Sequence, residues 1–578
     1  MKKIVSILVL AVMVVGSLFS LAACGAPEDD GAEIAVYLGT EIYDLDPTDY
    51  YVNSNAEALM SLMYEPLFKL NANGGIEMGQ AERYDVDIYE REITVTLRES
   101  YWSDNTRVRA TDFIYAWCER LLNPNNPNPA AALLYDIEGA ASAKAGLTSP
   151  SDVKVAATGT YELTITYRDG ADPNQLIKNL ASVATSPVRQ NAVESAPSYW
   201  SKVAGTALSN GPFKLAKYSL VTSEITLSRN KGYHQNFESV DYDNVVIPAQ
   251  LVGVTTPTGE VTELTYSDIE NKTVFYMTDA PVADRLANKS KASFVDDTSV
   301  YTYVFNTTRE LFTIKEVRQA LSMAIDRGAI VSAVGVGKAA DGFVPDVSGG
   351  SGAELIKSGA NIEAAKALLA TVDLTGISKS FKLTVLDTEE NVKIAELVEA
   401  AWEELGFKVT VDKVSYVETT FKAESADADD VKIKDSEIQV LAKEASFGKR
   451  DFDVLALDWQ TYSTDSFVAL ASLSSSMNGC GMDFDGNTTR SSISGWVNAE
   501  YDYLVTRAYK SSGEERKALL LEAEELLCEE LPVCPIVFNQ NLAFVSSELS
   551  GITYDGFGNA VLARVSQNNY KEYLDKED

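Results

Sequence analysis

The chain has 578 residues and a formal net charge of −35, from 84 acidic and 49 basic side chains. A surface this acidic repels a phosphate backbone, so nucleic acid is not an expected partner. Hydrophobic residues make up 46% of the chain, enough for packed cores, and the length predicts about two to four domains rather than a disordered polymer.

The first residues have the pattern of an export signal. Met1-Lys2-Lys3 is followed by an apolar stretch over 4–21 and then by Ala22-Ala23-Cys24. A basic start, an apolar middle and small residues before a cysteine resemble a bacterial lipobox, which predicts a signal peptide over 1–23 and lipidation of Cys24. The alternative is an uncleaved membrane helix, although serine and glycine dilute the apolar stretch. Both interpretations place residues 25–578 outside the cytoplasm, and no later stretch predicts a membrane span.

Farther along, predicted strands and helices alternate. Residues 93–97 alternate apolar and polar, which predicts a half-buried strand. A helix is predicted after it, with Thr111 as its cap, Trp117 on its apolar face and an end before Pro124. Residues 381–386 then predict a strand, 391–405 a helix and 407–411 another strand. This order indicates a βαβ unit, so the predicted fold class is α/β, with mixed sheets covered by helices.

Two segments and one side chain stand apart from this pattern. Residues 423–448 are rich in charge and poor in aromatics, which predicts an exposed insertion. Residues 483–487 resemble a calcium loop, but the glycine comes early and Ser494 stands where glutamate is required, so an ordinary turn is favoured. The single histidine, His234, cannot form a multi-histidine metal site and is predicted to lie in a surface loop. No metal and no cofactor are expected.

The cysteines other than Cys24 are too few for a disulfide framework; they are Cys118, Cys480, Cys528 and Cys534. Cys528 and Cys534 flank Pro532, where a helix is expected to pass into a strand, and an exported protein could oxidise such a pair. The other interpretation is that both are small buried hydrophobic residues, because the sequence does not fix the separation of their Cα atoms.

The sequence carries no local signature of catalysis. It has no Walker phosphate loop, no G-x-S-x-G nucleophile elbow and no H-E-x-x-H motif. An enzyme is therefore not expected. A carboxylate pair of the glycosidase kind stays open as an alternative, because such pairs have no fixed local spacing.

A series of short segments carries a resemblance that covers nearly the whole mature chain. They are Gly39-Thr40-Glu41, Leu45-Asp46-Pro47, residues 62–68 (LMYEPLF), 101–106 (YWSDNT), 110–113 (ATDF), 209–215 (SNGPFKL), 303–307 (YVFNT) and 317–327 (VRQALSMAIDR). In their order and spacing they resemble the extracytoplasmic solute-binding proteins of peptide ABC transporters, the oligopeptide and dipeptide-binding family (family 5).

The resemblance implies a class II periplasmic-binding-protein-like fold, in which two lobes surround a cleft and one lobe carries an extra subdomain. By position, the chain is expected to cross between the lobes near Ser299 and near Leu531. The expected divisions are the signal peptide (1–23), a lipidated tether (24–33), lobe I in three parts (34–72, 196–299 and 532–578), its extra subdomain (73–195) and lobe II (300–531).

The family also implies that an aspartate just after a strand of lobe II receives the terminal ammonium of the peptide, and Asp458 matches it. A buried carboxylate suits a buried ammonium, because either charge alone is costly to desolvate. The alternative is that Asp458 only caps the turn after its strand. Trp459 is expected to pack along the peptide. The other implied ligand-binding residues are Ala456, Tyr51, Asn53, Thr278, Tyr301 and Tyr303. For the tyrosines, a core or hinge role is the alternative.

Several positions depart from the family. Residues 460–464 are longer than the acidic turn that usually follows the aspartate, and 248–275 and 423–448 do not follow the family. Phe452 stands where some members have an arginine for the carboxylate of the ligand. Peptide length is therefore left open.

Together these features predict a monomeric receptor, anchored to the cell membrane by its N-terminal lipid. It would enclose peptides between two lobes and deliver them to the permease subunits of an ABC importer. The alternatives are a receptor for another solute, such as a sugar oligomer or a signalling peptide, and a cell-surface hydrolase.

Overall fold

The computed structural model describes residues 33–39, 44–49, 54–218, 224–235, 244–248, 254–255, 261–262, 264–422, 430–478 and 492–568. The signal peptide, Cys24, Tyr51, Asn53, Cys480 and the turn at 483–487 lie outside these ranges. Within them, no helix has the length and apolar character needed to cross a membrane.

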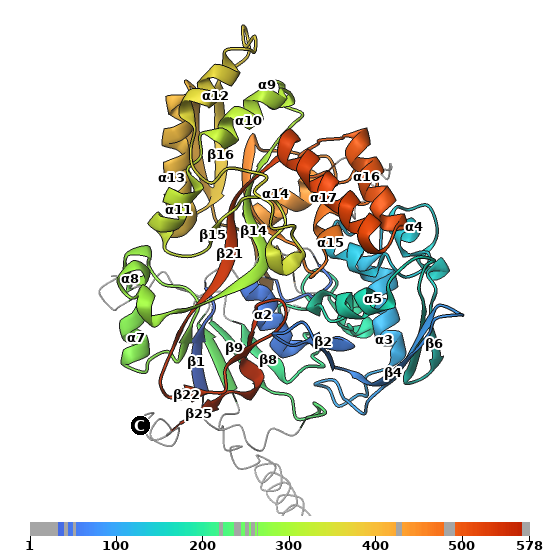
Figure 1. Ribbon diagram of the computed structural model, residues 1–578. Helices are drawn as coiled ribbons and strands as arrows, with labels where there is room; N and C mark the ends of the chain where they lie inside the picture. Colours follow the sequence, from blue (N-terminus) through green and yellow to red (C-terminus); the bar gives the residue numbers. More distant parts are fainter. Residues whose placement is uncertain are drawn as a thin grey trace, which may run out of the picture.

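One sheet runs through both lobes (Figure 1). Its strand order is β17-β16-β20-β14-β21-β13-β1-β10-β9-β8, and β15 also pairs with β21. The strands are β1 (Glu33–Tyr37), β8 (Phe213–Tyr218), β9 (Glu224–Arg229), β10 (Asn244–Pro248), β13 (Tyr276–Met277), β14 (Ser293–Phe305), β15 (Lys338–Ala339), β16 (Ser380–Leu386), β17 (Lys408–Val414), β20 (Val454–Gln460) and β21 (Val533–Val545). We call the part around β1, β8, β9, β10 and β13 lobe I, and the part around β16, β17 and β20 lobe II.

The two long strands, β14 and β21, belong to both lobes. Each has 13 residues, and they pair antiparallel from Ser293 opposite Ala543 to Val304 opposite Val533. Midway, residues 297–299 lie opposite the single residue Asn539, which is a bulge. β14 continues the sheet into lobe II through β20, and β21 continues it into lobe I through β13. The strands are therefore the crossings between the lobes.

Lobe II contains the βαβ unit that the sequence predicts. β16 and β17 are parallel, and α13 (Glu389–Glu404) connects them, ending at Gly406 with a φ of 89°. Two groups of helices cover the opposite faces of this part of the sheet (Figure 1). One group is α10 (Lys315–Met323), α11 (Arg327–Val334), α12 (Ile362–Leu369) and α13; the other is α14 (Glu437–Ser446), α15 (Ser466–Ala471), α16 (Ala499–Lys510) and α17 (Gly513–Glu530).

A second sheet, with the order β4-β5-β7-β6, packs beside lobe I. Its strands are β4 (Ala81–Asp87), β5 (Glu92–Leu97), β6 (Val155–Gly159) and β7 (Glu162–Thr166). β5 alternates buried and half-buried residues, so the predicted strand at 93–97 is confirmed. The predicted helix cap at Thr111 is wrong. Helix α3 (Ala110–Ile114) begins after Arg109, whose backbone N–H donates to Asp112 at 3.0 Å, and it continues as the π-helix Tyr115–Leu121.

The remaining helices and strands are short connecting elements. They are α2 (Ser54–Met63), β2 (Phe68–Leu70), β3 (Ile76–Met78), α4 (Ala140–Lys144), α5 (Pro173–Asn179), α6 (Gln190–Ser195), β11 (Val254–Thr255), β12 (Val261–Thr262), α7 (Tyr266–Glu270), α8 (Val282–Ala287), α9 (Glu310–Thr313), β22 (Leu549–Ser550), β23 (Thr553–Tyr554), β24 (Ala560–Val561) and β25 (Ser566–Gln567).

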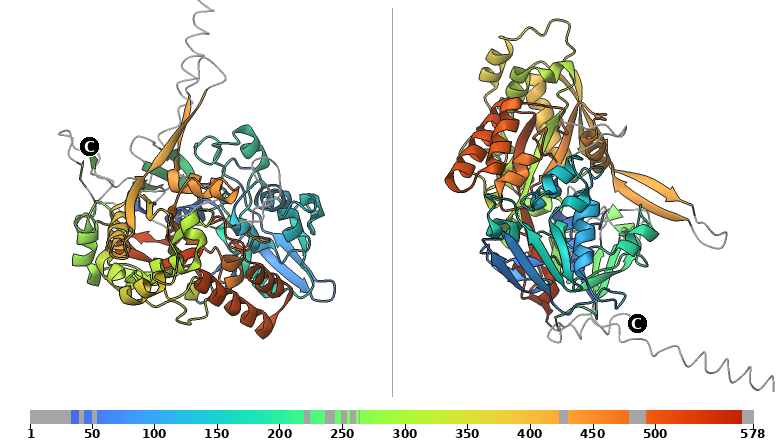
Figure 2. Two further views of the ribbon diagram at one scale, coloured as in Figure 1. Left: turned by 90° about the horizontal axis from the view of Figure 1, so that it is seen from above. Right: turned by 90° about the vertical axis from the view of Figure 1, so that its right-hand side faces the viewer.

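The segment predicted as an exposed insertion is only partly exposed. Strands β18 (Tyr416–Phe421) and β19 (Val431–Ser436) form a hairpin that projects from the body (Figure 2, right). Helix α14, however, buries Ile438, Ala442 and Ala445 against lobe II. Their spacing of four and three residues places them on one helical face, and the high charge of the segment obscured this pattern.

Two single-residue expectations are also decided by the fold. His234 is not a surface residue: its side chain is 3% exposed, Nε2 lies 2.5 Å from Glu65 Oε2, and Nδ1 lies 3.1 Å from Arg98. The surface prediction was wrong because the buried Glu65 carboxylate gives the imidazole a polar partner inside lobe I. Cys528 and Cys534 are free, buried thiols, which agrees with their interpretation as small hydrophobic residues.

Candidate functional site

A cavity of about 430 Å³ lies where the two lobes meet the crossing strands. From lobe I it is lined by residues that follow β1 and β13 and by α8. The middle parts of β14 and β21 form its wall, and lobe II contributes β20, α14 and the junction between β16 and α13. This volume is within the range typical of small-molecule sites.

Asp458 faces this cavity from β20. It lies inside the strand rather than just after it, directly opposite Tyr301 of β14. Successive side chains of a strand point to opposite faces, so Ala456 and Asp458 line the cavity, whereas Leu457 and Trp459 belong to the core on the other side.

The Asp458 carboxylate has no cationic partner within the described part of the chain. Asn539 donates a hydrogen bond of 2.7 Å to its Oδ1 and a second one of 2.8 Å to Ser299 Oγ. No ion pair joins Asp458 to a lysine or arginine among the described residues. Burial raises the pKa of Asp458 to about 7; the Asn539 hydrogen bond opposes this rise, and the charges of Asp297 and Glu390 add to it. A positive group that entered the cavity would stabilise the ionised Asp458 carboxylate and so lower its pKa.

Two more of the predicted ligand-binding residues line the same cavity. Tyr301 is 4% exposed, and its ring packs edge-on against Tyr303 with centroids 5.8 Å apart. Thr278 follows β13, and its Oγ1 donates to the Tyr37 carbonyl oxygen at 3.2 Å. The structure therefore brings together Asp458, Ala456, Tyr301 and Thr278.

The structure places Trp459 and Tyr303 away from the cavity. The Trp459 Nε1 donates to Ser472 Oγ at 3.0 Å, and its ring meets the edge of Phe343 with centroids 5.6 Å apart. Tyr303 is fully buried and packs edge-on against Trp402 in lobe II. Both are core aromatics in this arrangement. Tyr51 and Asn53 lie outside the described residues.

The sequence analysis did not single out several residues that line the cavity. Asn539, Gln540 and Asn541 form a polar run in the middle of β21, whose flanks are apolar and buried. That interruption was visible in the sequence and is typical of a strand whose centre faces a solvated space. Asp279 and Arg285 had no comparable signal, because Asp279 lies in a short irregular segment and Arg285 in the six-residue helix α8, both of mixed polarity.

The rim of the cavity carries contacts between the lobes. Arg285 Nη1 of α8 lies 2.8 Å from Glu390 Oε2 in the first turn of α13. The backbone N–H of Val282 donates to Glu389 Oε2 at 2.7 Å. Two acidic side chains of lobe II therefore bind α8 of lobe I, one by an ion pair and one by a hydrogen bond.

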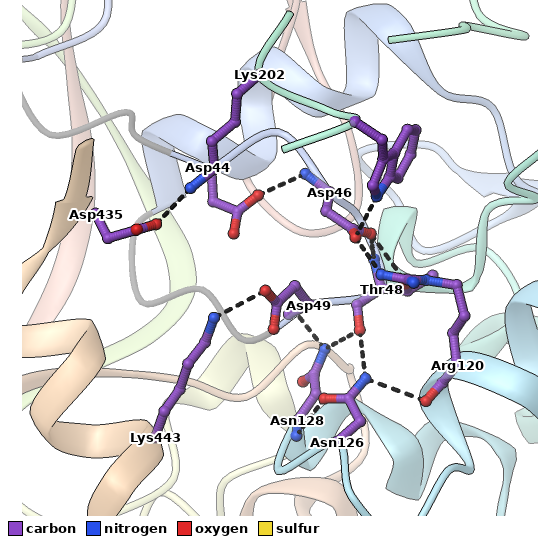
Figure 3. Close-up of polar contacts among 11 residues, drawn as sticks. Asp44, Asp46, Thr48, Asp49, Arg120, Asn126, Asn128, Lys202, Asp435 and Lys443 are labelled. Carbon is purple, nitrogen blue, oxygen red and sulfur yellow. Dashed lines mark hydrogen bonds and ion pairs between the residues drawn. The ribbon is translucent and has the colours of Figure 1, made fainter. Parts of the chain in front are cut away.

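A second group of interlobe contacts joins lobe I to the insertion (Figure 3). Lys443 of α14 lies 2.8 Å from Asp49 Oδ2, and Lys202 pairs with Asp435 of β19. Asp44 lies near both lysines; burial raises its pKa to about 7, although the two lysines act to lower it. We call these five residues the charged clasp. In each ion pair the lysine and the aspartate come from different lobes: Lys443 of lobe II pairs with Asp49, and Lys202 of lobe I pairs with Asp435, while Asp44 is a second aspartate from lobe I.

Comparison with known proteins decides the family. The model of the bacterial extracellular solute-binding proteins, family 5 (middle region), matches residues 75–479. The chain belongs to this family. It is similar to the dipeptide-binding protein DppE of Bacillus subtilis (26% identical, 93% of this chain and 95% of the relative) and to the periplasmic murein peptide-binding protein MppA of Escherichia coli (28% identical, 95% and 96%).

Solved structures of the same fold confirm the predicted class II architecture. The murein tripeptide-binding protein MppA of E. coli superposes with a TM-score of 0.74 (23% identical, 93% of this chain and 99% of that chain). Haemophilus influenzae OppA, in complex with the peptide RPPGFSPFR, gives 0.73 (20% identical, 93% and 99%).

The arrangement of the lobes differs from one of these structures. The unliganded open form of MppA gives a TM-score of only 0.53, against 0.74 for the other structure of the same protein. Since the relative is the same, the difference comes from its conformation. The lobes of this chain therefore do not lie as in that open form, in agreement with the contacts between them.

Proposed function

We propose that this protein is a lipid-anchored extracytoplasmic receptor that encloses peptides between its lobes and delivers them to the permease subunits of an ABC importer. The observation that carries the proposal is the Asp458 carboxylate, which faces an interlobe cavity and is held by a neutral amide. The terminal ammonium of a peptide supplies the charge that this carboxylate lacks.

The cavity wall suits a peptide main chain. Asn539, Gln540 and Asn541 bring side-chain amides, which both donate and accept hydrogen bonds, next to Asp458. Main-chain amides are common to all peptides, so such contacts recognise a peptide without selecting its sequence. The names of the relatives support this ligand class: one is a dipeptide-binding protein, and the OppA structure contains a nine-residue peptide.

The receptor role includes no chemistry on the ligand. Neither the catalytic motifs nor, within the described residues, a group of side chains placed to hold a metal is present. The alternatives predict different results. A sugar oligomer has no ammonium for Asp458, and a hydrolase would convert its ligand, whereas a receptor returns it intact.

The proposal is tested by calorimetric titration with trialanine and with its N-acetyl derivative. We expect trialanine to bind and the acetylated peptide to bind at least about 30-fold more weakly, because a charge pair that loses one buried partner costs about 2 kcal/mol or more. The Asp458→Asn variant should lose affinity for trialanine by a similar factor. Asp85→Asn is the matched control, since Asp85 lies in strand β4 and is exposed.

Native mass spectrometry of the protein purified from cells provides the second readout. A retained series of peptide masses, reduced in Asp458→Asn but not in Asp85→Asn, agrees with a peptide receptor. A protein that binds neither trialanine nor any retained peptide contradicts it. Conversion of the added peptide into fragments would support the hydrolase instead.

A further inference from the structure

The cavity wall is far more acidic than the rest of the chain. It contains six carboxylates, from Asp279, Asp297, Asp387, Glu389, Glu390 and Asp458. Among the described lining residues, Arg285 is the one cation. Six acids to one base exceeds the ratio of 84 to 49 in the whole chain.

The single cation of the wall is buried. The Arg285 side chain is 3% exposed and its Nη1 is paired with Glu390, whereas its Nε and Nη2 have no hydrogen-bond partner among the described residues. A carboxylate on a ligand therefore finds no exposed positive group in the described wall. The ligand must instead approach the remaining acids.

Three of these acids have neutral hydrogen-bond donors or face solvent instead of forming an ion pair. Asp279 accepts hydrogen bonds from the Tyr37 hydroxyl at 3.2 Å and from the Ala280 N–H at 2.8 Å, both neutral donors. Asp458 has the neutral amide of Asn539, and Asp387 is exposed at the junction between β16 and α13. None of the three forms an ion pair with another described residue.

The carboxylates also act on one another across the cavity. After burial, the charges of Asp297 and Glu390 contribute to the raised pKa of Asp458. Burial also raises the pKa of Asp279; Arg285 opposes this rise and Glu390 adds to it. The negative potential is therefore shared by elements from both lobes. A cleft with low-dielectric walls concentrates such a potential and attracts ligands of the opposite sign.

We propose that the cavity selects peptides that carry a second positive charge in addition to their terminal ammonium, such as a lysine, arginine or other diamino acid side chain, and that it rejects acidic peptides. This inference rests on the proposed function: Asp458 receives the terminus, and the acids around Asp279 and Asp387 receive the side chain. A ligand with one ammonium leaves most of the wall charge uncompensated, whereas an acidic side chain adds like charge to it.

The test is calorimetric titration near neutral pH with trialanine, Ala-Lys-Ala and Ala-Glu-Ala. These peptides have the same length and termini and differ only in the charge of the central side chain. We expect Ala-Lys-Ala to bind about tenfold or more tightly than Ala-Glu-Ala, with trialanine between them. High salt should narrow this difference, because it screens the exposed part of the interaction.

The variant Asp387→Asn should bring the affinities for Ala-Lys-Ala and trialanine closer together, and Asp279→Asn should do the same. Asp387 is exposed, so its variant tests the charge without disturbing the core. Asp85→Asn serves as the control and should leave the order of the peptides unchanged. Thermal unfolding of each variant checks that it is folded before titration.

The outcomes separate this inference from the proposed function. If the three peptides bind equally, or if Ala-Glu-Ala binds most tightly, charge selection is wrong and the peptide receptor remains. If no peptide binds, both are wrong. If the preference for lysine persists in both asparagine variants, another part of the protein sets it and the assignment to this wall is overturned.

Discussion

Asp458 links the stability of the ligand-free protein to pH. Its pKa in the folded protein is about 7, above the ordinary value of 3.8, because the site is buried and negatively charged. A folded state that holds a proton more tightly than the unfolded chain gains stability at low pH and loses it as the pH rises through the folded pKa. Asp44 shifts in the same direction and by a similar amount.

We predict that Asp458→Asn becomes more stable relative to the wild-type protein as the pH rises from about 5 to about 8. Asparagine cannot ionise, so the variant escapes the cost of placing a charge at this site. The difference in melting temperature should change by roughly 1–3 °C over this interval. Melting curves of both ligand-free proteins at a series of pH values measure it. A difference that stays constant with pH would mean that Asp458 is already charged and compensated throughout.

At the level of elements, the sequence predicts best those segments whose pattern is local. The βαβ unit at 381–411 was predicted because strand alternation, helical spacing and Gly406 all lie within one stretch of chain. The orientation of single side chains was harder to predict from the sequence. Trp459 follows Asp458 directly, but the strand turns it into the core, and an assignment by neighbouring position could not account for this.

The insertion is a further element whose role depends on distant contacts. Its hairpin projects from the body, yet Lys443 of α14 and Asp435 of β19 join the insertion to residues of lobe I that are nearly 400 and more than 200 positions away. No local pattern marks such pairs. The charged clasp thus became visible only in the folded molecule.

We predict that removing one lysine of the charged clasp loosens the two lobes. Lys443→Met leaves Asp49 and Asp44 without this cation, and Lys202→Met leaves Asp435 and Asp44 without the other. Because the groups are partly buried, each change should cost about 1–3 kcal/mol of unfolding free energy. Denaturant unfolding measures the loss, and small-angle X-ray scattering of the ligand-free variants should show a larger radius of gyration.

Lys432→Met is the control for the clasp. Lys432 pairs with Glu418 within the same hairpin, and both side chains are exposed. Its loss should change stability by less than about 0.5 kcal/mol and leave the scattering curve unaltered. Equal losses of unfolding free energy in Lys432→Met and Lys443→Met would contradict a specific contribution from the link between the lobes.

For the whole molecule, the family and the two-lobed architecture could be predicted from short segments in a fixed order, because each segment belongs to a local strand, helix or turn of one shared fold. The details of the site could not. Its walls come from β1, β13, β14, β16, β20 and β21, which are brought together only when the sheet forms. The resemblance pointed to Asp458, Tyr301 and Thr278, whereas Asp279 and Arg285 could be identified as lining residues only in the folded structure.

The proposed lipid anchor is also a property of the whole molecule. We predict that Cys24→Ser moves the protein from the membrane fraction to the soluble fraction of the producing cells, because serine cannot form the thioether that attaches the lipid. Fractionation followed by immunoblotting measures the distribution, and intact mass shows whether the mature protein carries acyl chains. Ser20→Ala is a control, since it leaves the cysteine in place. Retention of Cys24→Ser in the membrane would favour the uncleaved helix.

The bulge in the crossing strands has a mechanical consequence. Residues 297–299 and Asn539 lie midway along the two strands that join the lobes, and Asn539 and Ser299 connect to Asp458. When two lobes rotate about a hinge, residues beside the hinge axis move least and residues far from it move most. If Asp458 receives the terminal ammonium as proposed, its surroundings should change little between open and closed arrangements of the lobes. The proposed receptor would then bind the amino terminus of the peptide first, and the outer edges of the lobes would close over the rest of the peptide afterwards.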